Sequence, residues 1–192
     1  MDVMPSLVDP VLPPGSLGGR EQPVLEAGGL LLRPWGPADY GAVLAAYADS
    51  DIQQWHARSM TDREAAAWIR SWGERWEQET GAGWAVTDGS PVVGRVALKR
   101  IDLDEGLGEV AYWVLADARG QRVATRALCA MSDWAFASGF HRLELVHAVE
   151  NHASCRVAQA AGYCLEGTKR QEALHADGWH DMHLHARLSG DQ

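Results

Sequence analysis

The residues best suited to chemistry lie where a predicted strand ends, a glycine turn follows and a helix begins. This segment reads Trp113-Val114-Leu115-Ala116-Asp117-Ala118-Arg119-Gly120-Gln121-Arg122-Val123-Ala124-Thr125. The first backbone N–H groups of a helix have no intrahelical acceptor and lie at the positive end of the helix dipole. The helix in this segment starts with small residues, so the segment predicts an anion site that suits a pyrophosphate.

Four histidines near the C-terminus are the other group that could do chemistry: His175, His180, His183 and His185. On a strand, His183 and His185 share one face with Asp181, an arrangement that permits a metal site. No helical H-x-x-x-H pair or cysteine partner accompanies them, and exposed strand histidines are common. We therefore expect no metal ion.

An alternation of strands and helices must position these residues. The apolar patterns predict strands at residues 30–33, 84–87, 92–99, 108–115, 142–148, 163–168 and 179–188. Helices are expected at residues 37–49, after the capping box Thr61-Asp62-Arg63-Glu64, and at residues 121–138 and 152–161. This order predicts a single α/β (α+β) domain with one mixed sheet, spanning residues 28–190.

Residues 1–27 are expected to precede this domain as an arm without regular structure. Five of the eight prolines fall in this stretch, together with several glycines. Proline removes backbone donors and glycine raises chain entropy, so regular elements are disfavoured. Such an arm either moves freely or packs on a neighbouring molecule.

Composition narrows the class of partner. With 17 basic and 26 acidic residues the formal charge is −9, which disfavours nucleic acid and anionic membranes. The three cysteines form no C-x-x-C pair, so no disulfide framework or zinc knuckle is predicted. No apolar run approaches the ~20 residues of a membrane helix, and no signal peptide is recognisable. These features favour the cytoplasm.

A tryptophan stripe follows the capping box. Trp68, Trp72 and Trp76 recur every fourth residue, so one helix face is strongly apolar. Two interpretations stay open for this stripe: packing in the core, or the wall of a substrate groove to which Trp55 also contributes.

Three blocks of residues are more specific together than alone. They are Glu109-Val110-Ala111-Tyr112-Trp113, then Arg119-Gly120-Gln121-Arg122-Val123-Ala124, then Asn151-His152-Ala153-Ser154 with Ala161-Gly162-Tyr163 and Glu166-Gly167-Thr168. The second block resembles the R/Q-x-x-G-x-G/A pyrophosphate loop of the GNAT superfamily of N-acetyltransferases. The others resemble the E-[IV]-G-Y-W strand and the N-x-x-S, G-[FY] and E-G signature of its RimJ/RimL branch, which acetylates ribosomal-protein N-termini. The resemblance runs from about residue 30 to residue 188.

The resemblance implies a mostly antiparallel sheet with splayed middle strands, flanked by helices, and acetyl-coenzyme A (acetyl-CoA) as cosubstrate. The pantetheine arm is expected along residues 113–115 like an added strand, and the amides of residues 121–125 at the pyrophosphate. Asn151 is expected to bond the pantetheine arm, although asparagine is also an ordinary N-cap. The expected cofactor-binding residues are Trp113, Val114, Leu115, Arg119, Gly120, Gln121, Arg122, Val123, Ala124, Thr125, Asn151 and Ser154.

Arg122 and Ala111 depart from the family pattern, which has glycine at both positions. Glycine lets a cofactor approach the backbone closely. Helical dihedral angles at residue 122 would suit arginine, whose guanidinium either pairs with a phosphate or points to solvent.

The implied reaction is direct transfer of the acetyl group to a primary amine in a ternary complex. Holding thioester and amine together supplies roughly 7–11 kcal/mol of the barrier reduction in such reactions. Glu109 is expected to act as the base, directly or through water, unless it is a strand-edge glutamate in an ion pair. The tyrosine acid usual in the family falls at Ala158, so Ser154 is expected either to replace it or to satisfy an amide of the first helical turn.

The acetyl acceptor is expected to be a protein N-terminus, as in the RimJ/RimL branch, or a small-molecule amine. Its expected contacts are Tyr112, Trp72, Trp76 and Glu166. Because of Arg122 and the missing tyrosine, a catalytically silent acetyl-CoA-binding module stays open as an alternative. The many tryptophans and the arm are compatible with a homodimer.

Overall fold

The structure, a computed structural model, describes residues 7–191. Its strands are β1 (Leu25–Ala27), β2 (Leu30–Pro34), β3 (Ala82–Thr87), β4 (Val92–Asp102), β5 (Leu107–Val114), β6 (Arg142–Ala148), β7 (Cys164–His175) and β8 (Gly178–Leu188). Its α-helices are α1 (Tyr40–Ala48), α2 (Ser50–His56), α3 (Asp62–Glu77), α4 (Val123–Ala137) and α5 (His152–Ala160), with 3-10 turns at Pro37–Asp39 and Ala116–Ala118. The strands form one eight-stranded sheet in the order β1-β2-β3-β4-β5-β6-β8-β7.

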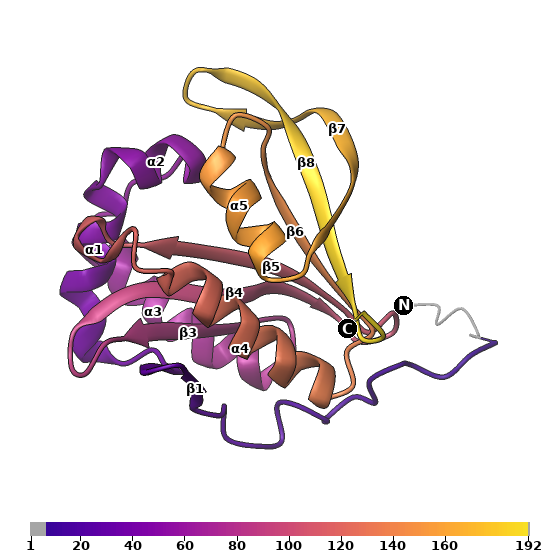
Figure 1. The fold of residues 1–192 in the computed structure, drawn as a ribbon. Coiled ribbons are helices and arrows are strands. Elements are labelled where there is room, and N and C mark those ends of the chain that lie inside the picture. Colours follow the sequence, from indigo (N-terminus) through magenta and orange to yellow (C-terminus); the bar gives the residue numbers. More distant parts are fainter. Residues whose placement is uncertain (1–6, 192) are drawn as a thin grey trace.

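The sheet divides between β5 and β6, as Figure 1 shows. These two strands are parallel and pair only from Leu107 opposite Arg142 to Val110 opposite Leu145. Beyond that point residues 111–114 and 146–148 separate, and α5 lies over the gap. The other neighbouring pairs in the described chain are antiparallel. The expected sheet with splayed middle strands is therefore confirmed.

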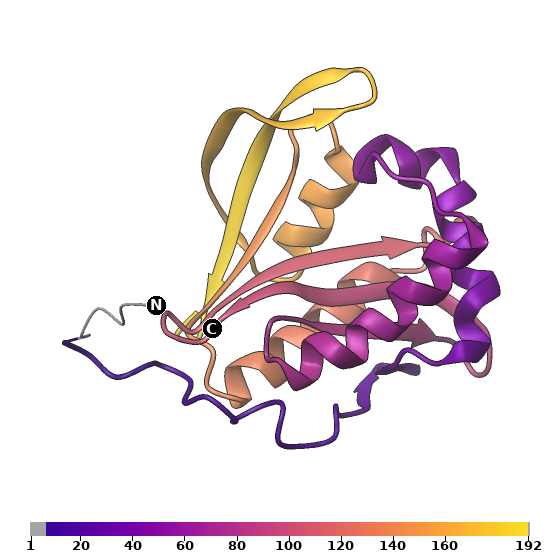
Figure 2. The ribbon, with the colours of Figure 1, turned by 180° about the vertical axis from the view of Figure 1, so that it is seen from behind.

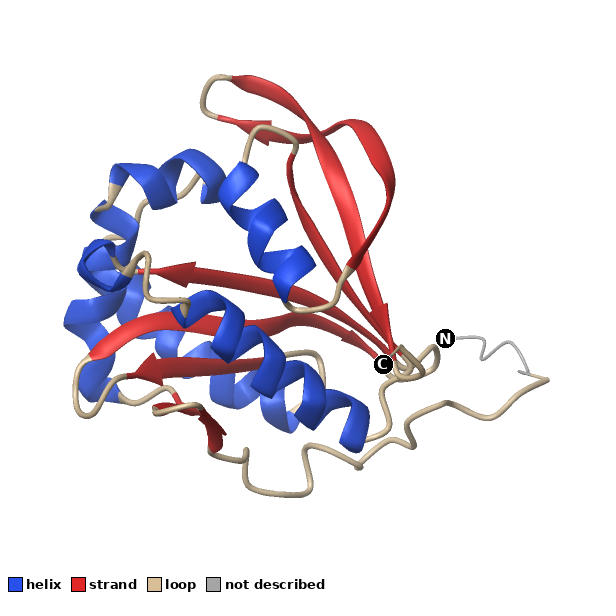
Figure 3. Ribbon diagram, in the orientation of Figure 1, coloured by secondary structure: helices blue, strands red, loops and turns tan. Residues whose placement is uncertain are grey.

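Helices cover both faces of the β1–β5 half of the sheet. Helix α4 lies in front of it in Figures 1 and 3, and α3 covers the opposite face, as the reverse view in Figure 2 shows. Trp72 of α3 packs directly over Gly83 of β3, where an added Cβ would come within 2.4 Å of the indole ring. Glycine at this position is thus required by the close approach of helix and strand. Within residues 7–191, no helix is both long and apolar enough to cross a bilayer.

Two helix boundaries show how local side chains set the elements. The capping box at Thr61 and Glu64 is present, as predicted. The helix expected at residues 37–49 is present as the 3-10 turn at Pro37–Asp39 followed by α1, and it ends as expected where Asp49 becomes extended. Helix α2, which begins directly after Asp49, was not expected. The Asp49 carboxylate accepts hydrogen bonds from the amides of Asp51 and Ile52 and so caps α2.

The N-terminal arm packs on its own domain and is not wholly irregular, so the expectation of a free arm or one held by a neighbour is corrected. Residues 25–27 form β1, and Leu12 and Leu17 are buried. The indole N–H groups of Trp76 and Trp84 donate to the carbonyls of Arg20 and Pro23, at 2.7 and 2.8 Å. Residues 1–6 of the expected arm lie outside the described residues.

The Glu79 carboxylate binds the arm at a second place. It accepts hydrogen bonds from the amides of Gly15, Leu17 and Gly18, at 2.6, 2.6 and 3.1 Å. A proline- and glycine-rich segment leaves backbone amides without partners from regular structure. One carboxylate just after α3 supplies partners for three of them.

Candidate active site

Two adjoining cavities occupy the place where the sheet divides. The first has a volume of about 860 Å³ and the second about 670 Å³. Five residues line both: Trp55, His56, Tyr112, Asn151 and Ser154. The two cavities therefore meet at these shared side chains, which we call the junction residues.

The first cavity gathers most of the predicted cofactor-binding residues. Those that line it are Trp113, Val114, Arg119, Gly120, Arg122, Val123, Ala124, Thr125, Asn151 and Ser154. Leu115 and Gln121 do not line it: Leu115 packs against the apolar cluster of α1 and α3, and the Gln121 amide donates to the carbonyl of Asp117. Ten of the twelve predicted residues thus line one cavity, while two side chains point elsewhere; cofactor binding by these residues stays a prediction.

The N-terminus of α4 opens into this first cavity. The N-cap residue Arg122 makes no side-chain capping bond, and the amide of Arg126 bonds the carbonyl of Arg122. The amides of Val123, Ala124 and Thr125 precede this first intrahelical donor, so they have no acceptor within the helix. Together with the helix dipole, these free amides make the start of α4 a suitable anion site, as the sequence predicts for a pyrophosphate.

Arg122 adopts the left-handed conformation, with φ 58° and ψ 22°. The expectation of helical dihedral angles at this residue is wrong. A residue with a side chain costs about 1–2 kcal/mol in this conformation, whereas glycine adopts it freely. The loop thus keeps a backbone shape suited to glycine at a position where this chain has arginine.

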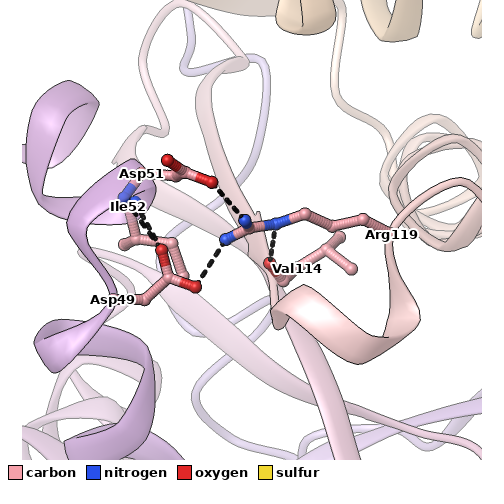
Figure 4. A network of polar contacts seen from close by, with 5 residues as sticks. All are labelled: Asp49, Asp51, Ile52, Val114 and Arg119. Atoms are coloured by element: carbon pink, nitrogen blue, oxygen red, sulfur yellow. Dashed lines mark hydrogen bonds and ion pairs between the residues drawn. The ribbon is translucent and has the colours of Figure 1, made fainter.

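The Arg119 side chain reaches toward the start of α2 (Figure 4). Its guanidinium pairs with Asp49 at 2.7 Å and with Asp51 at 2.6 Å, and its Nε donates to the carbonyl of Val114 at 3.2 Å. Planar guanidinium donors suit such a set of oxygen acceptors. Arg119 therefore ties the loop to the start of α2 and to the end of β5.

Backbone groups at the open edge of β5 already have side-chain partners. The His56 ring nitrogen lies 3.3 Å from the carbonyl of Tyr112, and Arg119 bonds that of Val114. Strand alternation places the amides of these two residues on the same edge. A carbonyl oxygen has two lone pairs, so a ligand laid along this edge can still share it.

The ionisation of the junction side chains is set mainly by burial. Burial, reinforced by the charge of Arg95, lowers the pKa of His56 to about 4, so this imidazole is neutral at pH 7. Burial raises the pKa of Tyr112 to about 12, so the phenol keeps its proton. The Tyr112 hydroxyl donates to the carbonyl of Ser154 at 3.4 Å, across the gap between β5 and α5.

Asn151 caps α5 and lines both cavities. Its Oδ1 accepts a hydrogen bond from the amide of Ser154 at 3.0 Å, so the N-cap interpretation is confirmed. The same side chain carries two N–H donors that a bound ligand can use. Ala158, where the family's tyrosine acid would stand, is fully buried and faces the core.

Glu109 lines the second cavity and is held by ion pairs. Its carboxylate lies 2.5 Å from Lys99 and 3.7 Å from Arg100. The register of β4 against β5 shifts between Leu98 and Arg100, and such bulges re-aim side chains. The structure shows the ion pairs, and the role of Glu109 as the base stays a prediction.

Only some of the expected acceptor contacts line the second cavity. Tyr112 and Trp72 line the second cavity. Trp76 does not line either cavity; it packs against Trp134 in the core on the arm side. Glu166 also lies away from both cavities and forms a bidentate pair with Arg142, which lowers the pKa of the carboxyl. These two expectations are corrected.

Two residues of the site were missed in the sequence. His56 gave no signal, because nothing around the end of α2 marks a functional histidine. Arg95 stands on β4 among apolar residues, 6% exposed, and its guanidinium packs over Trp68 and Trp72 at 5.2 and 4.8 Å from the ring centroids. Burial lowers its pKa only to about 10, so it is a cation at pH 7. Its position as a charged residue within an apolar strand was the feature of the sequence that could have identified Arg95.

Comparison with known proteins agrees with this geometry. The model of the acetyltransferase (GNAT) domain family matches residues 29–163, more than half of the chain. The ribosomal-protein-serine acetyltransferase of Escherichia coli (strain K12) is 29% identical over 102 residues, which cover 53% of this chain and 57% of that relative. The chain thus matches little more than half the length of this relative.

Two solved structures share the fold. One is RimL, a ribosomal alpha-N-protein acetyltransferase, in complex with coenzyme A (TM-score 0.79, 20% identity, 86% of this chain and 98% of that one). The other is the microcin C7 self-immunity acetyltransferase MccE with acetyl-CoA and AMP (TM-score 0.76, 16% identity, 84% and 93%). The chain belongs to the GNAT family of acetyltransferases, for which acetyl-CoA is the acetyl donor.

Proposed function

We propose that this enzyme acetylates the N-terminal amine of a protein by direct attack in a ternary complex. The observation that carries the proposal is the meeting of two cavities at the junction residues. The first cavity has the anion site and the second reaches the same point from the other side. Thioester and amine entering from opposite sides come together there.

The chemistry requires one bond to form and one to break. The amine lone pair attacks the thioester carbonyl, and the C–S bond then breaks as the tetrahedral intermediate collapses. The departing thiolate takes a proton from a hydroxyl, for which Ser154 and the protonated Tyr112 both stand at the junction. The amine proton passes to a base, directly or through water.

Two groups are placed to act as the base. Glu109 lines the second cavity but is shared with two cations. His56 is neutral at pH 7 and lines both cavities. The variants Glu109→Gln and His56→Gln distinguish them, since loss of the base lowers kcat whereas loss of a binding contact raises KM.

The charges of the second cavity favour an acceptor with an acidic group near its amine. Its basic residues are Arg58, Arg75, Arg95 and Lys99, and its acidic residues are Glu109 and Glu172. Complementary charge selects partners and steers their approach. Peptides that begin with serine and continue with acidic residues are therefore the first acceptors to test, since one relative acetylates ribosomal-protein serine. The cytoplasm, where ribosomal proteins are made, is the proposed location.

The test is acetyl-CoA consumption over matched serine peptides that differ only in acidic or lysine residues at the next two positions, with small amines in parallel. We expect the acidic peptide to have the highest kcat/KM and Glu166→Gln, outside both cavities, to match wild type. Preference for a small amine would replace the proposed acceptor. Acetyl-CoA binding without transfer to any of them would favour the silent module.

A further inference from the structure

The structure brings three histidines and one cysteine together beside the junction. They are His147 on β6, His183 and His185 on β8, and Cys155 on α5. One ligand atom from each lies within 4.8 Å of every other. We call these residues the N₃S cluster and propose that it binds one zinc ion or a similar divalent metal.

The sheet register places all three imidazoles on one face. His147 pairs directly with His183 across the β6–β8 ladder, and His185 follows two residues later. Residues directly opposite each other, and residues two apart on one strand, point to the same face. Helix α5 packs on this side and supplies Cys155, whose sulfur lies 4.0 Å from Nε2 of His185. The cysteine partner absent from the sequence pattern thus comes from a different element.

Hydrogen bonds fix which ring nitrogens face the cluster. Nδ1 of His147 lies 2.8 Å from the carbonyl of Ala148, and Nδ1 of His185 lies 3.4 Å from the carbonyl of Tyr163. An Nδ1–H that donates to a carbonyl leaves the lone pair on Nε2. This outer bond to a carbonyl is the usual companion of a metal-bound imidazole.

The nitrogens that face the cluster have no other partner. Nε2 of His147, in a residue 5% exposed, and Nδ1 of His183 are buried without a hydrogen bond. A buried polar atom left unpaired costs about 1–3 kcal/mol, which a bound cation removes.

Three imidazoles and a thiolate suit zinc. Zinc prefers four nitrogen and sulfur ligands in a tetrahedron, at about 2.0–2.1 Å for nitrogen and 2.3 Å for sulfur. In that geometry ligand atoms stand roughly 3.3–3.7 Å apart, so side-chain rotation has to bring the outermost pair about 1 Å closer. Four protein ligands close the coordination sphere, which is typical of structural sites. The metal would displace the thiol proton of Cys155 to solvent.

The second group that could hold a metal is already satisfied. His180, beside His175 on the β7–β8 hairpin, pairs with Asp177 at 2.8 Å and Glu150 at 3.2 Å. These carboxylates raise the pKa of His180 and so favour its protonated form, which binds no metal. The N₃S cluster is the one that we assign.

A metal in the N₃S cluster would join α5 to β6 and β8. Asn151 and Ser154, which line the junction, stand on the same helix end as Cys155. His147 itself lines the second cavity, which gives the ion a way in. The bound metal would therefore hold one wall of the gap at a fixed distance from the acceptor side.

The test uses the full chain, stripped of metal with a chelator and kept reduced without thiols. Cobalt(II) replaces zinc as a coloured probe, and elemental analysis gives the stoichiometry. We expect one metal per chain, intense visible bands of four-coordinate cobalt and a thiolate-to-cobalt charge-transfer band. Zinc should displace the cobalt and raise the midpoint of thermal unfolding.

Cys155→Ser is the decisive variant, with Cys164→Ser and His180→Asn as matched controls. Cys155→Ser should lose the charge-transfer band and bind zinc at least about 100-fold more weakly, because loss of an outer hydrogen bond alone costs about 10–100-fold. The controls should behave as wild type. Circular dichroism and coenzyme A binding show that each variant is folded. The proposal would be overturned if folded Cys155→Ser bound zinc as tightly as wild type does. It would also be overturned if the wild-type chain bound no stoichiometric metal.

Discussion

The half-buried imidazole of His56 makes stability depend on pH in a defined direction. Its ordinary pKa of 6.5 in the unfolded chain falls to about 4 in the folded protein, chiefly because burial disfavours the charged ring. Between these values the unfolded state binds a proton that the folded state does not. Stability is therefore unaffected above about pH 6.5 and is lost as the pH falls toward 4.

The size of the loss follows from the two pKa values. At about pH 5 it amounts to about 2 kcal/mol, and at lower pH it approaches about 3 kcal/mol. The comparison is between wild type and His56→Gln, whose amide can still donate to the carbonyl of Tyr112. Other titrating groups are present in both proteins and cancel in the difference. His152→Gln, at an exposed histidine on α5, is the matched control.

Urea unfolding at about pH 7.5 and about pH 5 measures the effect. Wild type and His152→Gln should lose about 2 kcal/mol more free energy of unfolding between these pH values than His56→Gln loses. Equal losses in wild type and His56→Gln would show that His56 is not held neutral by burial, and the reasoning would be refuted.

Three further predictions concern the first cavity. Arg122→Gly should be more stable than Arg122→Ala in urea by about 1 kcal/mol, because residue 122 is left-handed; the reverse order would contradict that conformation. Asn151→Ala should lower the free energy of unfolding by about 1 kcal/mol and weaken coenzyme A binding in calorimetry. Asn151→Asp should restore the cap but not the affinity, and recovery of both would exclude the amide as a ligand donor. Arg119→Lys should lower stability by about 0.5–1 kcal/mol, because lysine cannot span Asp49, Asp51 and the Val114 carbonyl; Asp51→Asn should cost less, since Asp51 is the more exposed partner.

Local patterns were sufficient for most of the fold. The capping box at Thr61 and the tryptophan period fix α3, because both depend only on residues within a few positions of one another. The division of the sheet came from the family resemblance and not from periodicity. Helix α2 was not predicted, because its seven residues are too few to show a helical period.

The errors in the site arise from contacts between distant segments. Glu109 meets two cations only because β4 has a bulge opposite it. Trp76 and Trp72 stand on the same helical stripe, yet one packs in the core on the arm side and the other lines the second cavity. Cys155 joins the histidines only after α5 folds onto β8. The spacing of residues within one helix or strand does not predict such contacts between distant segments.

Because the N-terminal arm packs on the domain, the boundary of the folded unit differs from the boundary of the family match. The match to the family model begins at residue 29, after the arm. The folded unit includes it, because Leu12 and Leu17 fill the core and two indoles depend on carbonyls at Arg20 and Pro23. Removing the arm would expose the apolar surface that Leu12 and Leu17 cover. The folded unit of this chain is therefore longer than the segment that the family model matches.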